Sequence, residues 1–121
     1  MVARLNWVVR AGKAAGRDAR TESEMRNVQE IVAILRQAMP ELSQDFSVTR
    51  LAVFGSYARG QQTESSDVDI LVEVDPSIGL RFVDLAERIE SLLGVPADVV
   101  SRRAVSPRHW AIIRKELVDV A

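Results

Sequence analysis

Two short runs of the chain carry the residue types that are needed to move a phosphoryl or nucleotidyl group. The first is GSYARG at residues 55–60, directly after an apolar segment, and the second is SDVD at residues 66–69, at the start of another. A turn of small residues can hold phosphate oxygens on its backbone N–H groups. Two aspartates that lie two positions apart on a strand, Asp67 and Asp69, point to the same face and can hold a hard divalent cation such as Mg²⁺ there.

Gly55, Ser56 and Arg59 are the residues of the first run with a direct chemical use. Gly55 leaves room for a phosphate because it has no Cβ. Ser56 adds a hydroxyl donor and could cap a following helix, whose N-terminus would favour negative charge. A Gly-Ser pair after a strand is, by itself, more often an ordinary turn. Arg59 has two interpretations: it contacts phosphate or a partner, or it pairs with a nearby acid such as Glu64.

A third carboxylate, Asp98, lies in the apolar run ADVV at residues 97–100. An acid within a short apolar strand is costly unless it is solvated, paired or bound to a metal. If this strand lies beside the one that carries Asp67 and Asp69, the three carboxylates can share an ion, and Asp98 can accept a proton from an incoming hydroxyl. The alternatives are a helix-capping or surface role for Asp98 and a solvated strand face for the other two.

The elements that must position these residues follow from hydrophobic periodicity and turn signals. A helix is expected to begin at a capping box formed by Thr21 and Glu24 and to end at Pro40. Residues 48–54 and 68–74 are rich in β-forming side chains and are expected to be strands. The other expected elements are a helix over 82–93 closed by Gly94, a strand over 96–100 and a last helix from Pro107.

The strand over 68–74 alternates between two kinds of side chain. Valine and isoleucine occupy its even positions and should face the core, whereas Asp67 and Asp69 share the opposite parity and should face solvent or a cleft. The order of helices and strands along the chain predicts a small α/β (α+β) fold, in which helices pack on a mixed β-sheet.

The composition is that of one globular domain of 121 residues without cysteine, which excludes disulfides and thiolate metal sites and fits a cytoplasmic protein. No apolar run approaches the length of a membrane span. Residues 1–20 carry a net charge of +4 and are expected to form a poorly ordered basic arm, while residues 21–121 form the domain and carry −5. An acidic domain of this kind argues against a broad nucleic-acid-binding face.

The chain resembles the minimal nucleotidyltransferase family, part of the DNA polymerase beta-like superfamily. The resemblance lies in the order of three features: the GSYARG run, the SDVD run and the single aspartate on a later strand. The resemblance covers residues 48–100 and extends through the last helix. It implies that Gly55 and Ser56 hold a nucleotide triphosphate. It also implies that Asp67 and Asp69 bind two Mg²⁺ ions and that Asp98 completes the metal site.

The resemblance also implies a substrate and a partner. Members of the family commonly act as antitoxins of HEPN-domain RNase toxins, in pairs of the type VII kind, and transfer AMP from ATP to a tyrosine of the toxin. Two alternatives stay open: an antitoxin that binds its toxin sterically without catalysis, and a nucleotidyltransferase that modifies a small molecule. The sequence fixes neither the nucleotide nor the oligomeric state, although strand edges or helix faces could serve a dimer.

Overall fold

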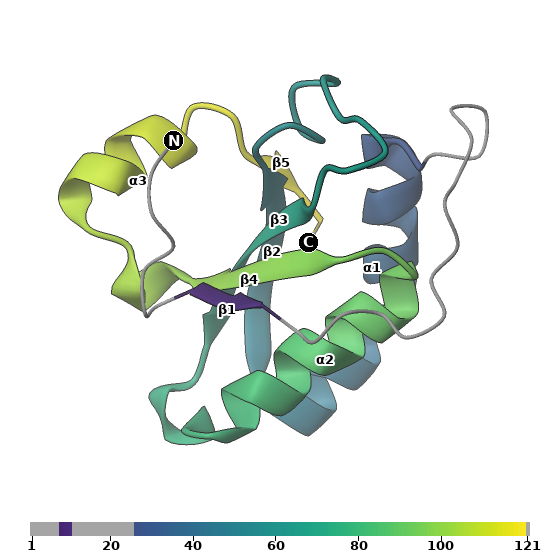
Figure 1. Ribbon diagram of the computed structural model, residues 1–121. Helices are drawn as coiled ribbons and strands as arrows, with labels where there is room; N and C mark the ends of the chain where they lie inside the picture. Colours follow the sequence, from purple (N-terminus) through teal and green to yellow (C-terminus); the bar gives the residue numbers. More distant parts are fainter. Residues whose placement is uncertain (1–7, 11–25, 121) are drawn as a thin grey trace.

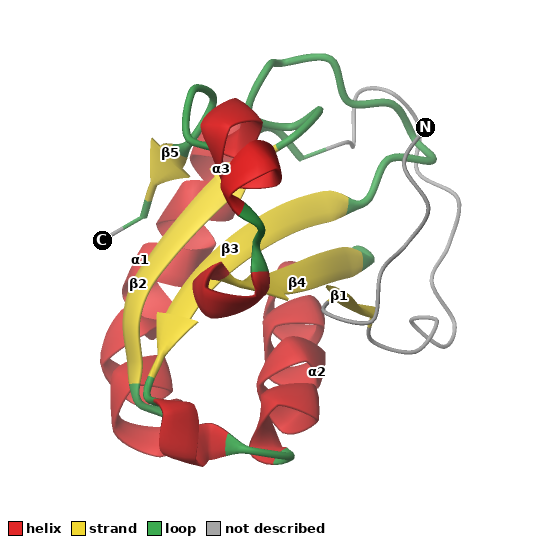
Figure 2. Ribbon diagram, turned by 90° about the vertical axis from the view of Figure 1, so that its left-hand side faces the viewer, coloured by secondary structure: helices red, strands yellow, loops and turns green. Residues whose placement is uncertain are grey.

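Five strands form one mixed β-sheet in the computed structural model of the protein, which describes residues 8–10 and 26–120 (Figure 1). Helices lie on both faces of this sheet (Figure 2). The elements are β1 (Val8–Arg10), α1 (Val28–Phe46), β2 (Val48–Phe54), β3 (Val68–Val74), the 3₁₀ helix η2 (Pro76–Ile78), α2 (Arg81–Leu93), β4 (Ala97–Ser101), the 3₁₀ helix η3 (Arg102–Ala104), α3 (Pro107–Ile113) and β5 (Val118–Asp119).

The strands are arranged in the order β1-β4-β3-β2-β5. β3 and β4 are parallel and are connected by α2, whereas the other neighbouring pairs are antiparallel. This confirms the expected mixed sheet, and β2 and β3 have the bounds expected from the sequence. β1 lies within the stretch expected to be an arm, the rest of which is outside the described residues. Neither β1 nor β5 was expected, because runs of three and two residues carry no periodic signal.

The first helix differs from the expectation at its end. Pro40 was expected to terminate it, but Pro40 lies inside α1, which continues to Phe46. A proline inside a helix costs about 3 kcal/mol. Here the buried Leu42 and Phe46 extend the apolar face beyond it, and burial of two such side chains offsets that cost. At the other end, Thr21 and Glu24 lie outside the described residues, and the capping box is formed by Asn27 and Glu30.

The two faces of the sheet bury different amounts of apolar surface. α1 and α2 cover one face and enclose the main core, which includes Val68, Ile70 and Val72 of β3. α3 lies on the opposite face above a smaller cluster, to which β3 contributes Leu71 (Figure 2). The even positions of β3 therefore face the main core as expected, whereas the opposite face, which was expected to meet solvent or a cleft, buries Leu71 in a second, smaller cluster. No helix in the described part of the chain combines the length and the apolar character of a bilayer span.

Candidate active site

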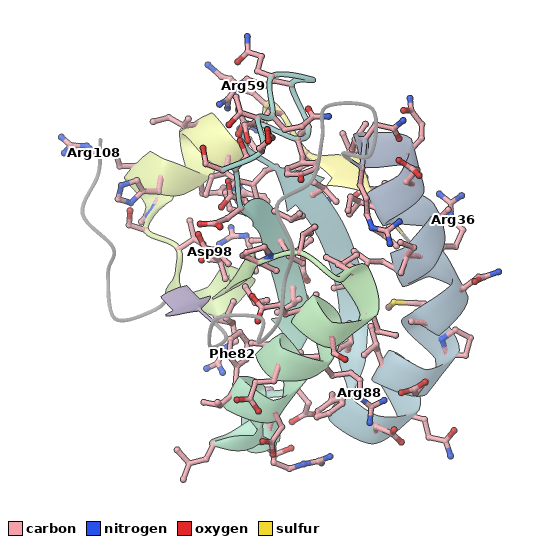
Figure 3. The ribbon with its side chains drawn as sticks, turned by 45° about the vertical axis from the view of Figure 1, so that its right-hand side comes forward. Arg36, Arg59, Phe82, Arg88, Asp98 and Arg108 are labelled. Atoms are coloured by element: carbon pink, nitrogen blue, oxygen red, sulfur yellow. The ribbon has the colours of Figure 1, made fainter. Side chains whose placement is uncertain are left out.

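The carboxylates singled out from the sequence lie on the face of the sheet that carries α3. Asp69 in β3 is the register partner of Asp98 in the parallel strand β4, and on its other side it is opposite Phe54 of β2. Register partners on neighbouring strands lie about 5 Å apart and direct their side chains to the same face. Asp67 comes one residue before β3 and shares this parity. The structure thus places Asp98 beside Asp69 on neighbouring strands in the middle of the sheet. Figure 3 labels Asp98 in the interior of the molecule.

Burial differs among these three carboxylates. Asp67 and Asp69 are half-buried, whereas Asp98 is only 1% exposed. Carboxylates are almost never this buried unless they have a hydrogen-bond, ionic or metal partner. Asp98 is buried in the sheet next to a second carboxylate, and this position argues against the alternative that it is an ordinary surface aspartate.

The carboxylates of Asp67 and Asp69 suit Mg²⁺ better than a metal ion whose ligands must all come from protein side chains. In the described part of the chain, no group of three or more histidine, cysteine, aspartate or glutamate side chains is arranged to hold a metal ion. Mg²⁺ does not need such a group, because it keeps several waters and takes one or two carboxylates together with substrate phosphates. Two aspartates on one face, next to a turn that can receive phosphates, fit this chemistry.

The turn after β2 is fixed by backbone hydrogen bonds rather than by a helix. Residues 55–60 form consecutive turns, in which the N–H of Arg59 donates to Gly55 O (3.1 Å) and that of Gln61 to Ser56 O (2.8 Å). Of the two alternatives for this segment, a short helix that Ser56 could cap or a turn, the structure shows the turn. The side chain of Tyr57 is 3% exposed and anchors the turn in the main core. Any phosphate at this turn would rely on its N–H groups and side chains rather than on a helix N-terminus.

Gly55 lies against the carboxylate of Asp69. Its φ is +77°, and a Cβ built on it would lie 2.1 Å from Asp69 Oδ2. No other residue type fits at this position without moving the aspartate. The glycine thus brings the backbone of the turn into close contact with one of the predicted metal ligands.

Glu116 is a member of the site that the sequence did not reveal. Its Oε2 accepts a hydrogen bond from the Gly55 N–H (2.7 Å), and its Oε1 pairs with Nη1 of Arg59 (2.9 Å). The expected acidic partner of Arg59 was Glu64, and the structure assigns that role to Glu116. Glu116 follows α3 and lies 57 residues from Arg59, so that only the tertiary fold brings them together.

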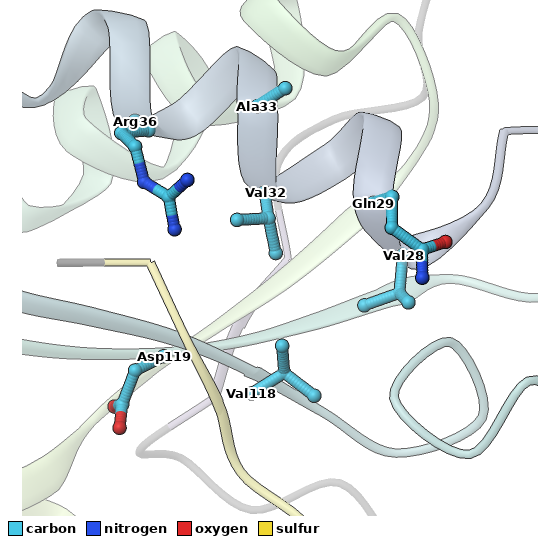
Figure 4. A pocket seen from close by; sticks show the side chains of 7 residues that line it. All are labelled: Val28, Gln29, Val32, Ala33, Arg36, Val118 and Asp119. Carbon is cyan, nitrogen blue, oxygen red and sulfur yellow. The ribbon is translucent and has the colours of Figure 1, made fainter.

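A hollow elsewhere on the surface does not contain any of these residues. It has a volume of about 400 Å³ and lies between α1 and β5, lined by residues such as Val32, Arg36 and Val118 (Figure 4). α1 covers the face of the sheet opposite to the one that carries the carboxylates. The hollow is therefore separate from the candidate active site.

Residues 34–120 of the chain match the model of the family described as the nucleotidyltransferase domain. The chain is 40% identical over 98 residues to the protein adenylyltransferase MntA of Thermococcus cleftensis, an alignment that covers 79% of this chain and 98% of that protein.

Two solved structures are also similar. One is assigned as a minimal nucleotidyltransferase, with a TM-score of 0.64 and 34% identity over 78% of this chain and 97% of the other. The other is a chain of a toxin–antitoxin crystal structure with AMP-PNP, with a TM-score of 0.56 and 25% identity over 71% of this chain and 72% of the other.

Proposed function

The chain belongs to the nucleotidyltransferase domain family, and from this premise we propose that it is a Mg²⁺-dependent protein adenylyltransferase that transfers AMP from ATP to a HEPN-domain toxin. The observation that carries the proposal is the register of Asp69 with Asp98 beside the turn that begins at Gly55. It supports the proposal because it brings a carboxylate pair to one sheet face beside a turn of small residues, and phosphoryl transfer requires both metal ligands and phosphate-binding groups.

Each residue of the site has a role in this mechanism. Gly55, Ser56 and Arg59 bind the triphosphate, the first two through the turn and Arg59 through its guanidinium group. Asp67 and Asp69 would hold two Mg²⁺ ions with the substrate phosphates, and Asp98 on β4 would complement this pair rather than belong to a preassembled three-carboxylate site. When bound, these ions would neutralise the triphosphate and the leaving pyrophosphate and would lower the pKa of the attacking hydroxyl.

The transfer step forms one bond and breaks another. The acceptor hydroxyl oxygen attacks the α-phosphorus of ATP, the bond between that phosphorus and the bridging oxygen of the β-phosphate breaks, and pyrophosphate leaves. The hydroxyl proton would pass to a carboxylate of the site, for which Asp98 is the candidate, and its register with Asp69 supports this role. The product is an acceptor that carries AMP.

A protein acceptor is supported by two of the similarities. The relative from Thermococcus cleftensis is named a protein adenylyltransferase, and one similar solved structure is a toxin–antitoxin with AMP-PNP. The motif resemblance narrows the acceptor to a HEPN-domain toxin and the acceptor group to a tyrosine hydroxyl.

Intact-mass spectrometry of the toxin tests the proposal. The HEPN-domain product of a neighbouring gene is incubated with the purified chain, Mg²⁺ and each of ATP, GTP, CTP and UTP in turn. We expect the toxin to gain the mass of one or more AMP units with ATP, and to gain none when EDTA removes the metal or when Asp67 and Asp69 are both replaced by asparagine.

A different outcome would change the assignment. A stable complex of the two proteins, without any mass gain for any nucleotide, would contradict catalysis and indicate an antitoxin that acts by steric contact. Transfer to a small hydroxyl compound but not to the toxin would contradict the protein acceptor.

A further inference from the structure

Glu116 occupies two of the donors that the proposed nucleotide site would use. We propose that its carboxylate takes the place of a phosphate group in the nucleotide-free chain, so that a triphosphate binds only by displacing it and Glu116 sets the affinity for the nucleotide. This inference rests on the proposed function, because it assumes that triphosphate binds at the turn of residues 55–60.

The geometry of the contact is that of a bound anion. The two oxygens of Glu116 engage two separate donors, the backbone N–H of Gly55 at 2.7 Å and the guanidinium group of Arg59 at 2.9 Å. Phosphate and carboxylate oxygens accept the same charge-assisted hydrogen bonds, and a guanidinium group binds either anion. A phosphate that used these donors would therefore have to replace the carboxylate.

The contact is exposed enough to be exchanged. The side chain of Arg59 is 47% exposed and that of Glu116 is 22% exposed, so both can regain water when they separate. Arg59 also donates from Nε to Gln61 Oε1 at 3.0 Å, which keeps its guanidinium group at the turn after the glutamate leaves. The Glu116 carboxylate can therefore leave while the guanidinium group of Arg59 stays at the turn.

The backbone of Glu116 limits how far a displaced carboxylate can move. Its N–H donates to Ile113 O at the end of α3 (3.0 Å), and β5 begins two residues later and pairs with β2. A displaced carboxylate would stay near the triphosphate and repel it. Removal of the charge should thus strengthen nucleotide binding for two reasons: it weakens a competitor and it removes this repulsion.

Calorimetric titration with AMP-PNP and Mg²⁺ tests the inference. We expect Glu116→Gln to lower the Kd about tenfold, which corresponds to about 1.4 kcal/mol. The matched control is Glu64→Gln, which removes the same charge from the β2–β3 connection and should leave the Kd within about twofold of the unmodified chain's, since Glu64 does not hold Gly55 or Arg59. An unchanged or higher Kd for Glu116→Gln would overturn the inference.

The contact itself can be observed without nucleotide. Phe54–Gly55 is the single Phe-Gly pair of the chain, so labelling phenylalanine with ¹³C at its carbonyl and glycine with ¹⁵N selects the Gly55 amide in an NMR spectrum. We expect its resonance to shift between the unmodified chain and Glu116→Gln, and to shift in the unmodified chain when AMP-PNP is added. Identical Gly55 resonances in the unmodified chain and the variant would overturn the inference, while the other glycine signals report whether the variant is folded.

The outcomes separate this inference from the proposed function. If the unmodified chain binds AMP-PNP and Glu116→Gln gains nothing, the inference fails and the proposed function stands. If neither the chain nor the variant binds AMP-PNP although both are folded, the proposed function fails and the inference fails with it. Binding by Glu116→Gln alone would support both.

Discussion

Asp69→Asn is expected to lower the rate of AMP transfer by about a thousandfold or more while the chain remains folded. Asp69 lies between β2 and β4 on the sheet face that carries α3, and it contributes both to the proposed metal site and to the contact with Gly55. Asparagine has nearly the same shape, but it is neutral and binds Mg²⁺ weakly. The rate is measured as the time course of AMP incorporation into the toxin, and stability as the midpoint of urea unfolding.

Glu73→Gln is the matched control for this substitution. Glu73 is on the same strand and has the same parity as Asp69, but it lies four residues away and pairs with Arg50 (3.2 Å) at a half-exposed position. Loss of that pair should cost at most about 1 kcal/mol of stability and leave the rate of transfer unchanged. Equal rates for Asp69→Asn and Glu73→Gln would exclude Asp69 from the chemistry.

The sequence was sufficient to predict the part of the site that is local in the chain. The bounds of β2 and β3 and the outward parity of Asp67 and Asp69 follow from side-chain alternation, which needs no knowledge of the rest of the fold. For Asp98, the sequence predicted only that it lies on a strand that could be next to the one carrying Asp67 and Asp69. Its register with Asp69 depends on the parallel pairing of β3 and β4, which no local signal specifies.

Glu116 could not be found from local signals because its role depends on contacts across the chain. It follows the last helix, and it is the single acid between Asp98 and Asp119 in a segment that is otherwise basic. Arginines and lysines close to it in the chain offer many local ion-pair partners, so the sequence gives no reason to expect a contact with Gly55 or Arg59. The error at Pro40 has a related cause: a local helix breaker was outweighed by tertiary burial of the apolar face beyond it.

Gly55→Ala is expected to reduce AMP transfer by about a hundredfold or more, with only a modest loss of stability. The new Cβ would lie 2.1 Å from Asp69 Oδ2 and 3.0 Å from Cγ of the same residue, so one of the two groups has to move. Because Oδ2 is at the end of a short side chain, the lowest-cost response is rotation of the Asp69 carboxylate away from the turn. This rotation relieves the clash, but it moves the Asp69 carboxylate away from the position in which it would bind the metal ion.

Gly60→Ala separates this effect from backbone strain. Gly60 has nearly the same φ as Gly55, +71° compared with +77°, but a Cβ built there meets nothing within 4 Å. Both substitutions should therefore share a strain cost of about 1–2 kcal/mol, which urea unfolding measures. Only Gly55→Ala should then lose transfer activity, because only at Gly55 does the new methyl group reach a proposed metal ligand. If both variants lose activity in proportion to their stability, the close approach of the turn to Asp69 has no catalytic role.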